Sequence, residues 1–186
     1  MSKPYWQGSR VRLRAVEPDD AAAHFVWNQD AGMTRPLDYV WFPQSRAAAQ
    51  RWAENLSLDS PPVGDVFHFV IETLAGELAG ALATHNCDRR VGSFGYGVAI
   101  REEQQRQGYA SEAIVLVLRH FFEELRYQKA TVTVYGFNEP SIRLHERLGF
   151  QREGQVRRMV YTQGQHFDLL YYGITGEEFA ARHSAS

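Results

Sequence analysis

The chain has 186 residues, of which 44% are hydrophobic and 23% are charged, and its formal net charge is −2. These values are typical of one globular domain with a buried core. The near-neutral charge and the scattered Lys and Arg residues argue against binding to the phosphate backbone of nucleic acids. No run of about 18 apolar residues is present, and the start of the chain lacks the apolar core of a signal peptide. We therefore expect neither a nucleic-acid nor a membrane partner.

The single cysteine, Cys87, rules out an internal disulfide framework and is typical of a reducing compartment. We therefore expect a cytoplasmic protein. Nothing near Cys87 in the sequence marks it as an activated nucleophile. The seven histidines include no pair at the H-x-x-x-H spacing of a helical metal site, so no metal is expected.

The first half of the chain has the patterns of helices and an antiparallel sheet. Val11 to Val16 alternates apolar and polar residues, as a half-buried strand does. Glu17-Pro18-Asp19-Asp20 then places a proline and acidic residues where a helix begins. Ala75-Gly76-Glu77 joins two strand-like runs and predicts a hairpin. The predicted elements are strand 11–16, a helix from 17 that fades by 30, an irregular aromatic-rich segment 31–42, helix 45–58, and strands 66–73 and 78–86.

The second half predicts a strand–helix–strand crossover, followed by a helix and a hairpin. The helix that begins at Ala110 carries apolar residues at helical spacing on one face. Asn138 is a preferred N-cap residue, and Gly149 is a preferred left-handed residue at a helix C-terminus. No repeat or linker divides the chain, so we expect one mixed α/β domain. The predicted elements are strand 94–100, a helix from 110, strand 130–135, helix 138–149, strand 150–161, a turn at 163–164 and strand 166–173.

The turn Gln105-Arg106-Gln107-Gly108-Tyr109-Ala110 connects the strand that ends at Ile100 to the following helix. The first N–H groups of a helix have no intrahelical acceptor, and the helix dipole is positive at this end. Phosphate oxygens bind readily at such a position, and Gly108 has no Cβ to obstruct a ligand. The turn is therefore either a diphosphate-binding site or an ordinary connection between a strand and a helix.

Two common nucleotide-binding loops are absent. The chain contains no G-x-x-x-x-G-K-[ST] segment. Gly95-x-Gly97 lacks the third glycine of the dinucleotide fingerprint, because Ile100 stands in its place. A nucleoside triphosphatase and a nicotinamide-dependent dehydrogenase are therefore disfavoured.

Three segments occur together in an informative order. They are the strand end Val98-Ala99-Ile100, the turn Gln105-x-x-Gly108-x-Ala110, and a segment that begins Asn138-Glu139-Pro140-Ser141 and ends Leu148-Gly149-Phe150. Together they resemble the GNAT superfamily of acyl-CoA-dependent N-acyltransferases, whose signature includes Q/R-x-x-G-x-G/A. The start, Val11-Arg12-Leu13-Arg14, resembles the branch that contains ribosomal-protein N-terminal acetyltransferases and spermidine acetyltransferases. The resemblance implies one domain over residues 9–174, with terminal extensions at 1–8 and 175–186.

The resemblance implies a central mixed, largely antiparallel sheet with two splayed parallel strands and flanking helices, and acetyl-CoA as co-substrate. The strand edge from Val98 to Ile100 would hydrogen-bond the pantetheine arm, and the amides of the turn would hold the pyrophosphate, to which Arg106 adds charge. Asn138 would reach pantetheine, serve as a helix N-cap, or do both. The implied cofactor-binding residues are Val98, Ala99, Ile100, Gln105, Arg106, Gln107, Gly108, Tyr109, Ala110, Ser111 and Asn138.

Attack of a neutral amine on the thioester requires stabilisation of an oxyanion and protonation of the leaving thiolate. By the resemblance, backbone donors near the splay, among them the N–H of Val98, would polarise the thioester carbonyl. Many relatives have a tyrosine where this chain has His145, and a histidine can also donate a proton. Ser141 is the alternative donor. Without a catalytic role, His145 would be an ordinary residue of an amphipathic helix and Ser141 a capping residue.

The general base is a second departure from the family pattern. Relatives often carry a carboxylate in the strand before the phosphate turn, where Ser93-Phe94-Gly95-Tyr96-Gly97 contains none. Deprotonation would then involve Tyr96, His85, Glu72 or an ordered water, or would need no dedicated base. An amine with a pKa of about 10 is mostly protonated at pH 7, so some path for this proton is required.

The acceptor site is expected between Asp30 and Trp52 and at the last hairpin. Asp38 and Glu54 would attract a cation there or simply be solvated. The turn at 123–128 and the last strand leave a homodimer open. Aromatic residues of the segment would line a pocket for an alkyl amine or a peptide end, or belong to the core: Tyr39, Trp41, Phe42 and Trp52.

The sequence therefore favours an acetyl-CoA-dependent N-acetyltransferase. Its acceptor would be a primary amine of a small molecule such as a polyamine, or of a protein N-terminus, which attacks directly in a ternary complex. Two alternatives stay open. One is a non-catalytic acyl-CoA sensor or interaction module on the same fold, and the other is a binding protein for a different phosphate-bearing ligand.

Overall fold

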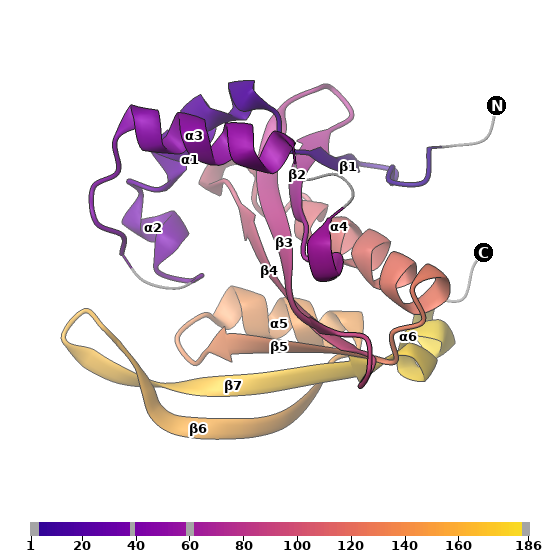
Figure 1. Cartoon of the computed structure of the whole chain (residues 1–186). Helices are drawn as coiled ribbons and strands as arrows, with labels where there is room; N and C mark the ends of the chain where they lie inside the picture. Colours follow the sequence, from indigo (N-terminus) through magenta and orange to yellow (C-terminus); the bar gives the residue numbers. More distant parts are fainter. Residues whose placement is uncertain (1–3, 38–39, 59–61, 184–186) are drawn as a thin grey trace. The chain divides into compact units, whose positions relative to one another are not determined.

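The computed structural model describes residues 4–37, 40–58 and 62–183. Its helices and strands are drawn in Figure 1. In chain order they are β1 (Val11–Ala15), η1 (Pro18–Asp20), α1 (Ala21–Trp27), α2 (Ala31–Thr34), α3 (Arg46–Ser57), η2 (Val63–Asp65), β2 (His68–Thr73), β3 (Leu78–Asp88), β4 (Ser93–Ile100), η3 (Glu102–Gln104), α4 (Tyr109–Arg119), η4 (His120–Glu124), β5 (Lys129–Tyr135), α5 (Glu139–Leu148), β6 (Gln151–Thr162), β7 (Gln165–Thr175) and α6 (Gly176–His183).

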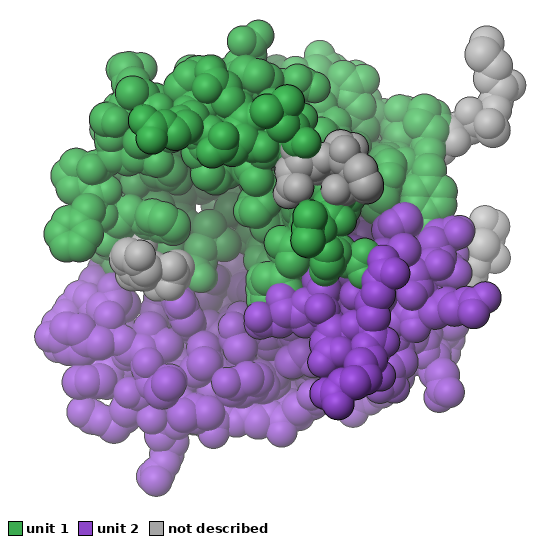
Figure 2. Space-filling view, in the orientation of Figure 1, with its two compact units in different colours: residues 1–85, 97–116 green, residues 86–96, 117–186 purple. Residues whose placement is uncertain are grey.

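The chain divides into two compact units, coloured green and purple in Figure 2. Unit 1 comprises residues 1–85 and 97–116. Unit 2 comprises residues 86–96 and 117–186. The boundary therefore falls within β4 and within α4, so each of these elements contributes residues to both units.

The described strands form a seven-stranded sheet in the order β1-β2-β3-β4-β5-β7-β6. In unit 1, β2 pairs antiparallel with β1 and β3. In unit 2, β7 pairs antiparallel with β5 and β6. The parallel pair joins β4 to β5 through Ser93↔Lys129 and Phe94↔Ala130, and this register stops there although β4 continues to Ile100. The predicted mixed, largely antiparallel sheet is confirmed, and α4 supplies the crossover that a parallel pair requires.

The core of unit 1 lies where α1 and α3 meet the sheet. Ser45 caps α3, since its Oγ accepts a hydrogen bond from the N–H of Ala48 at 3.1 Å. This start directs Ala53 into the core and leaves the polar residues of α3 exposed. A hydrophobic cluster results, with Val16, Ala21, Ala53 and Val70 buried and Trp52, Leu56 and Leu78 packed against them.

The core of unit 2 is built on β5 and on the aromatic residues that follow α4. Ala130, Val132 and Val134 are buried on one face of β5, as the period of two in a strand requires. Phe94 stacks on Phe121 with 4.0 Å between ring centroids. These contacts fix the start of β4 beside β5.

Two helices differ from the sequence prediction. The segment 31–42 was predicted to be irregular, but its first residues form α2, and Oδ1 of Asp30 accepts a hydrogen bond from the N–H of Gly32 at 2.7 Å. Residues 176–183, for which the sequence predicted no helix, form α6. Phe179 of α6 is buried and packs against Phe122, with 5.5 Å between ring centroids. A tertiary contact of one apolar side chain leaves no periodic pattern in the sequence.

Candidate functional site

The turn before α4 has the backbone of an anion-binding loop. Arg106 and Gly108 both adopt left-handed conformations, with φ of 62° and 82°. The first helical hydrogen bond runs from the N–H of Glu112 to the carbonyl oxygen of Gly108 at 3.1 Å. The N–H groups of Tyr109, Ala110 and Ser111 therefore precede the first intrahelical bond. Successive turns of this kind direct N–H groups to one concave side, which suits phosphate oxygens.

The side chain of Gln105 connects this turn to the end of β4. Its Nε2 donates to the carbonyl oxygen of Ile100 at 3.1 Å, at the point where β4 ends. Arg106, Gln107 and Gly108 are exposed to solvent. The side chain of Gln105 therefore holds the loop to the strand, while the following residues remain open to a ligand.

The end of β4 pairs with β3 along only one of its two edges. A Cβ at Gly80 of β3 would overlap the carbonyl oxygen of Ala99, and the N–H of Arg101 donates to the carbonyl oxygen of Ala79 at 2.9 Å. Backbone polar groups alternate between the two edges of a strand. Val98 therefore directs its N–H and carbonyl groups away from β3, which is the edge that an added strand-like ligand would use.

Arg10 and Glu112 are two residues of this region that sequence reasoning missed. Nη1 of Arg10 donates to the carbonyl oxygen of Gln107 at 2.7 Å, although the two residues are 97 positions apart. The carboxylate of Glu112 accepts from Ser9 N at 2.6 Å, Ser9 Oγ at 2.7 Å, and the N–H groups of Arg10 and Val11, each at 2.8 Å. Long-range contacts of this kind have no signal in a single sequence.

The charge state of Glu112 follows from these bonds. Burial by itself would raise the pKa of this carboxyl, but the hydrogen bonds from Ser9, Val11 and Arg10 outweigh it and hold the pKa below its ordinary value. Glu112 is thus an anchored carboxylate. It ties the segment before β1 to α4 and so holds the guanidinium of Arg10 beside the turn.

Unit 2 carries the other predicted site residues on and around α5. Oδ1 of Asn138 accepts a hydrogen bond from the N–H of Ser141 at 3.2 Å, so the predicted N-cap is confirmed. Gly149 ends α5 with a φ of 99°, as predicted. Between these ends, Ser141 and His145 lie one helical turn apart on the same face.

His145 is 3% exposed and lies among aromatic rings. Its Nδ1 is 2.8 Å from the carbonyl oxygen of Ser141 and 3.3 Å from the Oγ of the same residue. The rings of Tyr96 and Tyr172 stack on its own, at 5.9 Å and 6.4 Å between centroids, and Phe150 meets it edge-on at 5.1 Å. Unit 2 therefore brings together the three predicted catalytic residues, His145, Ser141 and Tyr96.

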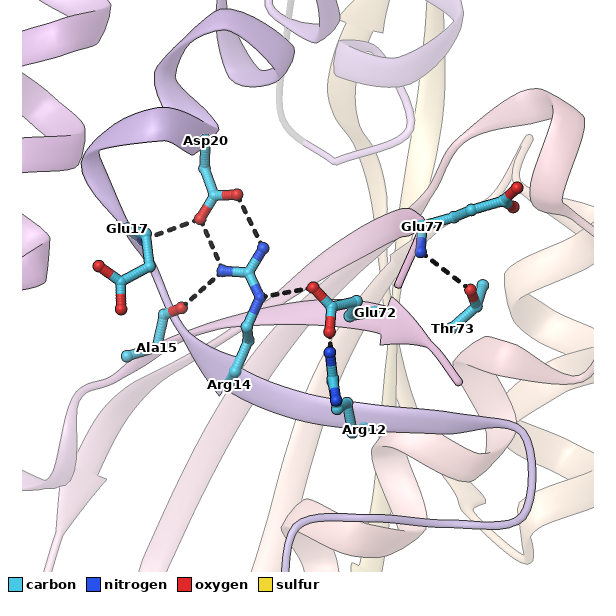
Figure 3. Close-up of polar contacts among 8 residues, drawn as sticks. All are labelled: Arg12, Arg14, Ala15, Glu17, Asp20, Glu72, Thr73 and Glu77. Carbon is cyan, nitrogen blue, oxygen red and sulfur yellow. Dashed lines mark hydrogen bonds and ion pairs between the residues drawn. The ribbon is translucent and has the colours of Figure 1, made fainter. Parts of the chain in front are cut away.

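Glu72 is part of an ion-pair network in unit 1, shown in Figure 3. Nε of Arg14 donates to Glu72 at 2.9 Å, the same guanidinium pairs with both oxygens of Asp20 at 2.8 Å, and Arg12 binds the other oxygen of Glu72. Burial alone would raise the pKa of Glu72, but the hydrogen bonds from Arg14 and Arg12 lower it. Such a carboxylate is a weak base, so we assign Glu72 to the structure of unit 1.

The other predicted residues are more dispersed. His85 is exposed on β3. Asp38 and Tyr39 lie outside the described residues. Trp41 and Phe42 contribute to a shallow cavity of about 310 Å³ in unit 1, which is lined by Asn28, Trp41, Phe42, Pro43, Gln44, Ser45 and Ala48.

Neither a metal cluster nor a membrane-spanning helix is found in the part of the chain that the structure describes. No group of three or more His, Cys, Asp or Glu side chains is arranged to hold a metal ion in residues 4–37, 40–58 and 62–183. No helix within the same ranges is both long and apolar enough to cross a bilayer.

The order of these features is that of a known enzyme family. A family model described as an acetyltransferase (GNAT) domain matches residues 10–151. The chain belongs to the GNAT family. The enzyme class predicted from the sequence, an N-acyltransferase, is confirmed by this match. GNAT acetyltransferases take their acyl group from acetyl-CoA.

Two curated relatives span nearly the whole chain. The SPbeta prophage-derived uncharacterized N-acetyltransferase YokL of Bacillus subtilis (strain 168) is 40% identical over 183 residues, which is 98% of this chain and 99% of that protein. The spermidine N(1)-acetyltransferase of Escherichia coli (strain K12) is 25% identical over 175 residues, 93% of this chain and 90% of that protein. The predicted likeness to the branch with spermidine acetyltransferases is confirmed.

A solved structure shows the same fold. The spermidine N-acetyltransferase from Vibrio cholerae, in complex with CoA and spermine, matches with a TM-score of 0.80 at 21% identity. The match covers 92% of this chain and 99% of that chain. The GNAT fold predicted from the sequence is thereby confirmed.

Proposed function

We propose that this GNAT protein transfers an acetyl group from acetyl-CoA to a primary amine, of a polyamine or other small molecule or of a protein N-terminus. The observation that carries the proposal is the left-handed turn at Arg106 and Gly108, which opens α4 and exposes its first N–H groups. In a family that uses acetyl-CoA, this turn is where we expect the pyrophosphate to bind, because the N-terminus of a helix binds anions. We place the reaction in the cytoplasm, where the single cysteine would stay reduced.

Each part of acetyl-CoA has a proposed partner in the chain. Amides from Arg106 to Ser111 hold the pyrophosphate, with charge from Arg106 and Arg10. The edge of Val98, with Ala99 and Ile100 in the same strand end, hydrogen-bonds the pantetheine arm. Gln105 positions the turn through Ile100, and Asn138 reaches the pantetheine while capping α5.

The thioester supplies an electrophilic carbonyl carbon, and the chain supplies donors and a route for the proton. The N–H of Val98 stabilises the oxyanion that forms when an amine attacks. His145, Ser141 and Tyr96 of unit 2 form the proposed proton-handling group. General acid–base catalysis by such a group is commonly worth about 10²–10⁴-fold in rate.

A polyamine is the first acceptor to test. The relative from Escherichia coli is named for spermidine, and the matched structure from Vibrio cholerae contains spermine. The cavity at Trp41 and Phe42 offers aromatic faces to an alkyl ammonium chain, which aromatic rings attract through their π electrons. A protein N-terminus remains the second acceptor, since the same branch includes enzymes that modify ribosomal proteins.

Calorimetric titration of the full chain tests the donor half of this proposal. We expect saturable binding of acetyl-CoA, with free pantetheine and ADP each much weaker than the whole molecule. A panel of spermidine, spermine and short peptides with free N-termini is then assayed by release of the CoA thiol. Binding without transfer to any amine would support the alternative of an acyl-CoA sensor, and absence of binding would overturn the proposal.

A further inference from the structure

The tautomer of His145 is fixed by its position on α5. Its Nδ1 lies 2.8 Å from the carbonyl oxygen of Ser141. A carbonyl oxygen only accepts hydrogen bonds, so Nδ1 must carry the hydrogen. A neutral imidazole has one N–H group, and Nε2 is therefore left with a lone pair.

The surroundings of the ring favour this neutral form. Burial lowers the pKa of His145, and the bond to Ser141 raises it by less, so the resulting pKa lies below the ordinary value of a histidine. Tyr96 on β4 is an uncharged phenol whose pKa burial raises well above its usual value. Tyr172 on β7 donates to Glu146 at 3.1 Å, so the nearby carboxylate of α5 is already engaged by a hydroxyl.

Two buried polar atoms of these neighbouring rings have no hydrogen-bond partner among the described residues. They are Nε2 of His145 and the hydroxyl oxygen of Tyr96. Buried polar groups are nearly always paired, so an unpaired one in a folded protein needs a reason, such as catalysis or contact with a ligand or water. In the neutral state Nε2 of His145 can therefore accept a proton, and the Tyr96 hydroxyl can donate one.

We propose that His145 is the proton acceptor of the transfer reaction, held in the Nδ1–H tautomer by the Ser141 carbonyl, and that it is not an acid in the resting enzyme. This inference rests on the proposed acetyltransferase function and assigns the order of its proton steps. A resting acid would need a hydrogen on Nε2. That hydrogen requires either a buried imidazolium or the other tautomer, which would lose the bond to Ser141.

The proposed step conserves atoms and charge. The amine nitrogen forms a bond to the thioester carbonyl carbon, and the C–S bond breaks with its electron pair on sulfur. The proton lost by the nitrogen goes to Nε2 of His145, which becomes an imidazolium that keeps its Nδ1–H bond to Ser141. The imidazolium then gives the Nε2 proton to the thiolate, so the products are an amide and the CoA thiol and His145 is neutral again.

Nuclear magnetic resonance of the histidine rings tests the tautomer without any turnover. The full chain is labelled with ¹⁵N, and the ring of His145 is assigned as the signal that disappears in His145→Gln. We expect a protonated Nδ1 and an unprotonated Nε2 between about pH 7.5 and pH 8.5, above the ordinary pKa of a histidine, and we expect both to persist in Ser141→Ala, which keeps the carbonyl. A protonated Nε2 in this range would overturn the proposal.

The substitution His145→Tyr separates an acceptor from an acid. A tyrosine hydroxyl can donate a proton, but it is not a base at neutral pH. We expect the turnover number of His145→Tyr and of His145→Gln to fall by about 100-fold or more, the lower range of acid–base catalysis, while affinity for acetyl-CoA stays within a factor of about three. If His145→Tyr retains full turnover, His145 is not the acceptor.

The pH profile of the wild-type chain gives the same distinction. An essential acceptor loses turnover as the pH falls through the pKa of the ring, whereas an essential acid loses turnover as the pH rises through it. A wild-type chain that binds acetyl-CoA and acetylates no amine overturns the proposed function. A wild-type chain that acetylates an amine, with Nε2 protonated or with rate loss only at high pH, overturns the role of His145 alone.

Discussion

Arg10 and Gln107 are joined by a hydrogen bond of 2.7 Å from Nη1 to the backbone carbonyl oxygen, although one precedes β1 and the other lies in the turn before α4. The contact depends on Glu112, whose carboxylate accepts the backbone N–H groups of Ser9, Arg10 and Val11. A guanidinium has five donors, and only one is used by Gln107. The segment that precedes β1 thus brings a second cation to the turn that we assign to the pyrophosphate.

Removal of this cation should weaken binding of acetyl-CoA. We expect Arg10→Ala to raise the dissociation constant by about tenfold, as the loss of one hydrogen bond to a charged group worth about 1.5 kcal/mol would. Arg90→Ala, which removes an exposed arginine of unit 2, is the matched control and should leave the constant unchanged. Calorimetry at two salt concentrations measures the dissociation constant of acetyl-CoA for each variant. If Arg10→Ala and wild type bind acetyl-CoA with equal affinity, Arg10 only contacts the turn and does not bind the ligand.

The left-handed conformation at Gly108 predicts a pair of glycine variants with different outcomes. Gly108 has a φ of 82° and Gly76 a φ of 88°, so an alanine at either position costs about 1–2 kcal/mol of backbone strain. A Cβ at Gly108 lies 3.3 Å from Nη1 of Arg10, whereas a Cβ at Gly76 has nothing within 4 Å. The melting temperatures of Gly108→Ala and Gly76→Ala should therefore fall by similar amounts. Affinity for acetyl-CoA should fall only in Gly108→Ala. The more drastic Gly108→Glu should abolish binding in a folded chain, and binding retained by Gly108→Glu would remove the turn from the site.

Substitution of Glu112 should change both stability and its dependence on pH. Because the folded pKa of Glu112 lies below its unfolded value of about 4.3, its contribution is present above that pH and is lost as the pH falls through the folded pKa. We expect Glu112→Gln to lower the free energy of unfolding by about 2 kcal/mol at pH 7 and to flatten the acid limb of the stability curve. Glu123→Gln, at an exposed carboxylate, should do neither. Urea unfolding from pH 3 to pH 7 measures the difference.

The network in Figure 3 predicts unequal effects for its two arginines. Arg14 bridges two buried carboxylates, Asp20 and Glu72, so Arg14→Ala leaves charges unpaired and should cost about 3–5 kcal/mol. The side chain of Arg12 is 47% exposed, so Arg12→Ala should cost about 1 kcal/mol or less. Chemical denaturation compares them. Equal losses would mean that the bridge between β1, η1 and β2 does not depend on Arg14.

Asn138→Ala separates capping from ligand contact. The side chain accepts the N–H of Ser141, and the loss of such a cap costs about 1 kcal/mol. We expect that loss in melts without ligand. If Asn138 also contacts pantetheine, the difference in melting temperature between variant and wild type should widen when acetyl-CoA is added, because the stability added by a ligand rises with the logarithm of its concentration divided by its dissociation constant. A constant difference would leave Asn138 as a cap only.

Local sequence was sufficient for most elements, because their signals lie within a few residues. Asn138 as an N-cap and Gly149 as a left-handed C-terminal residue act on their own helix, α5. The alternation in β1 follows the period of its own strand. The missed helix α6 is stabilised instead by Phe179 packing on Phe122, a contact far apart in the chain that no local pattern reports.

The order of the motifs in the sequence by itself indicated the family. The turn at Gly108 and the cap at Asn138 were also predictable, since each depends on a backbone conformation or hydrogen bond that the residue type favours. Only the tertiary structure decided what the side chains do. Glu72, one of several candidate bases in the sequence, is bound by two arginines in the structure. Arg10 joined the turn through a carboxylate on α4. Likewise, burial and the Ser141 carbonyl, which no single sequence displays, determine which nitrogen of His145 carries its hydrogen.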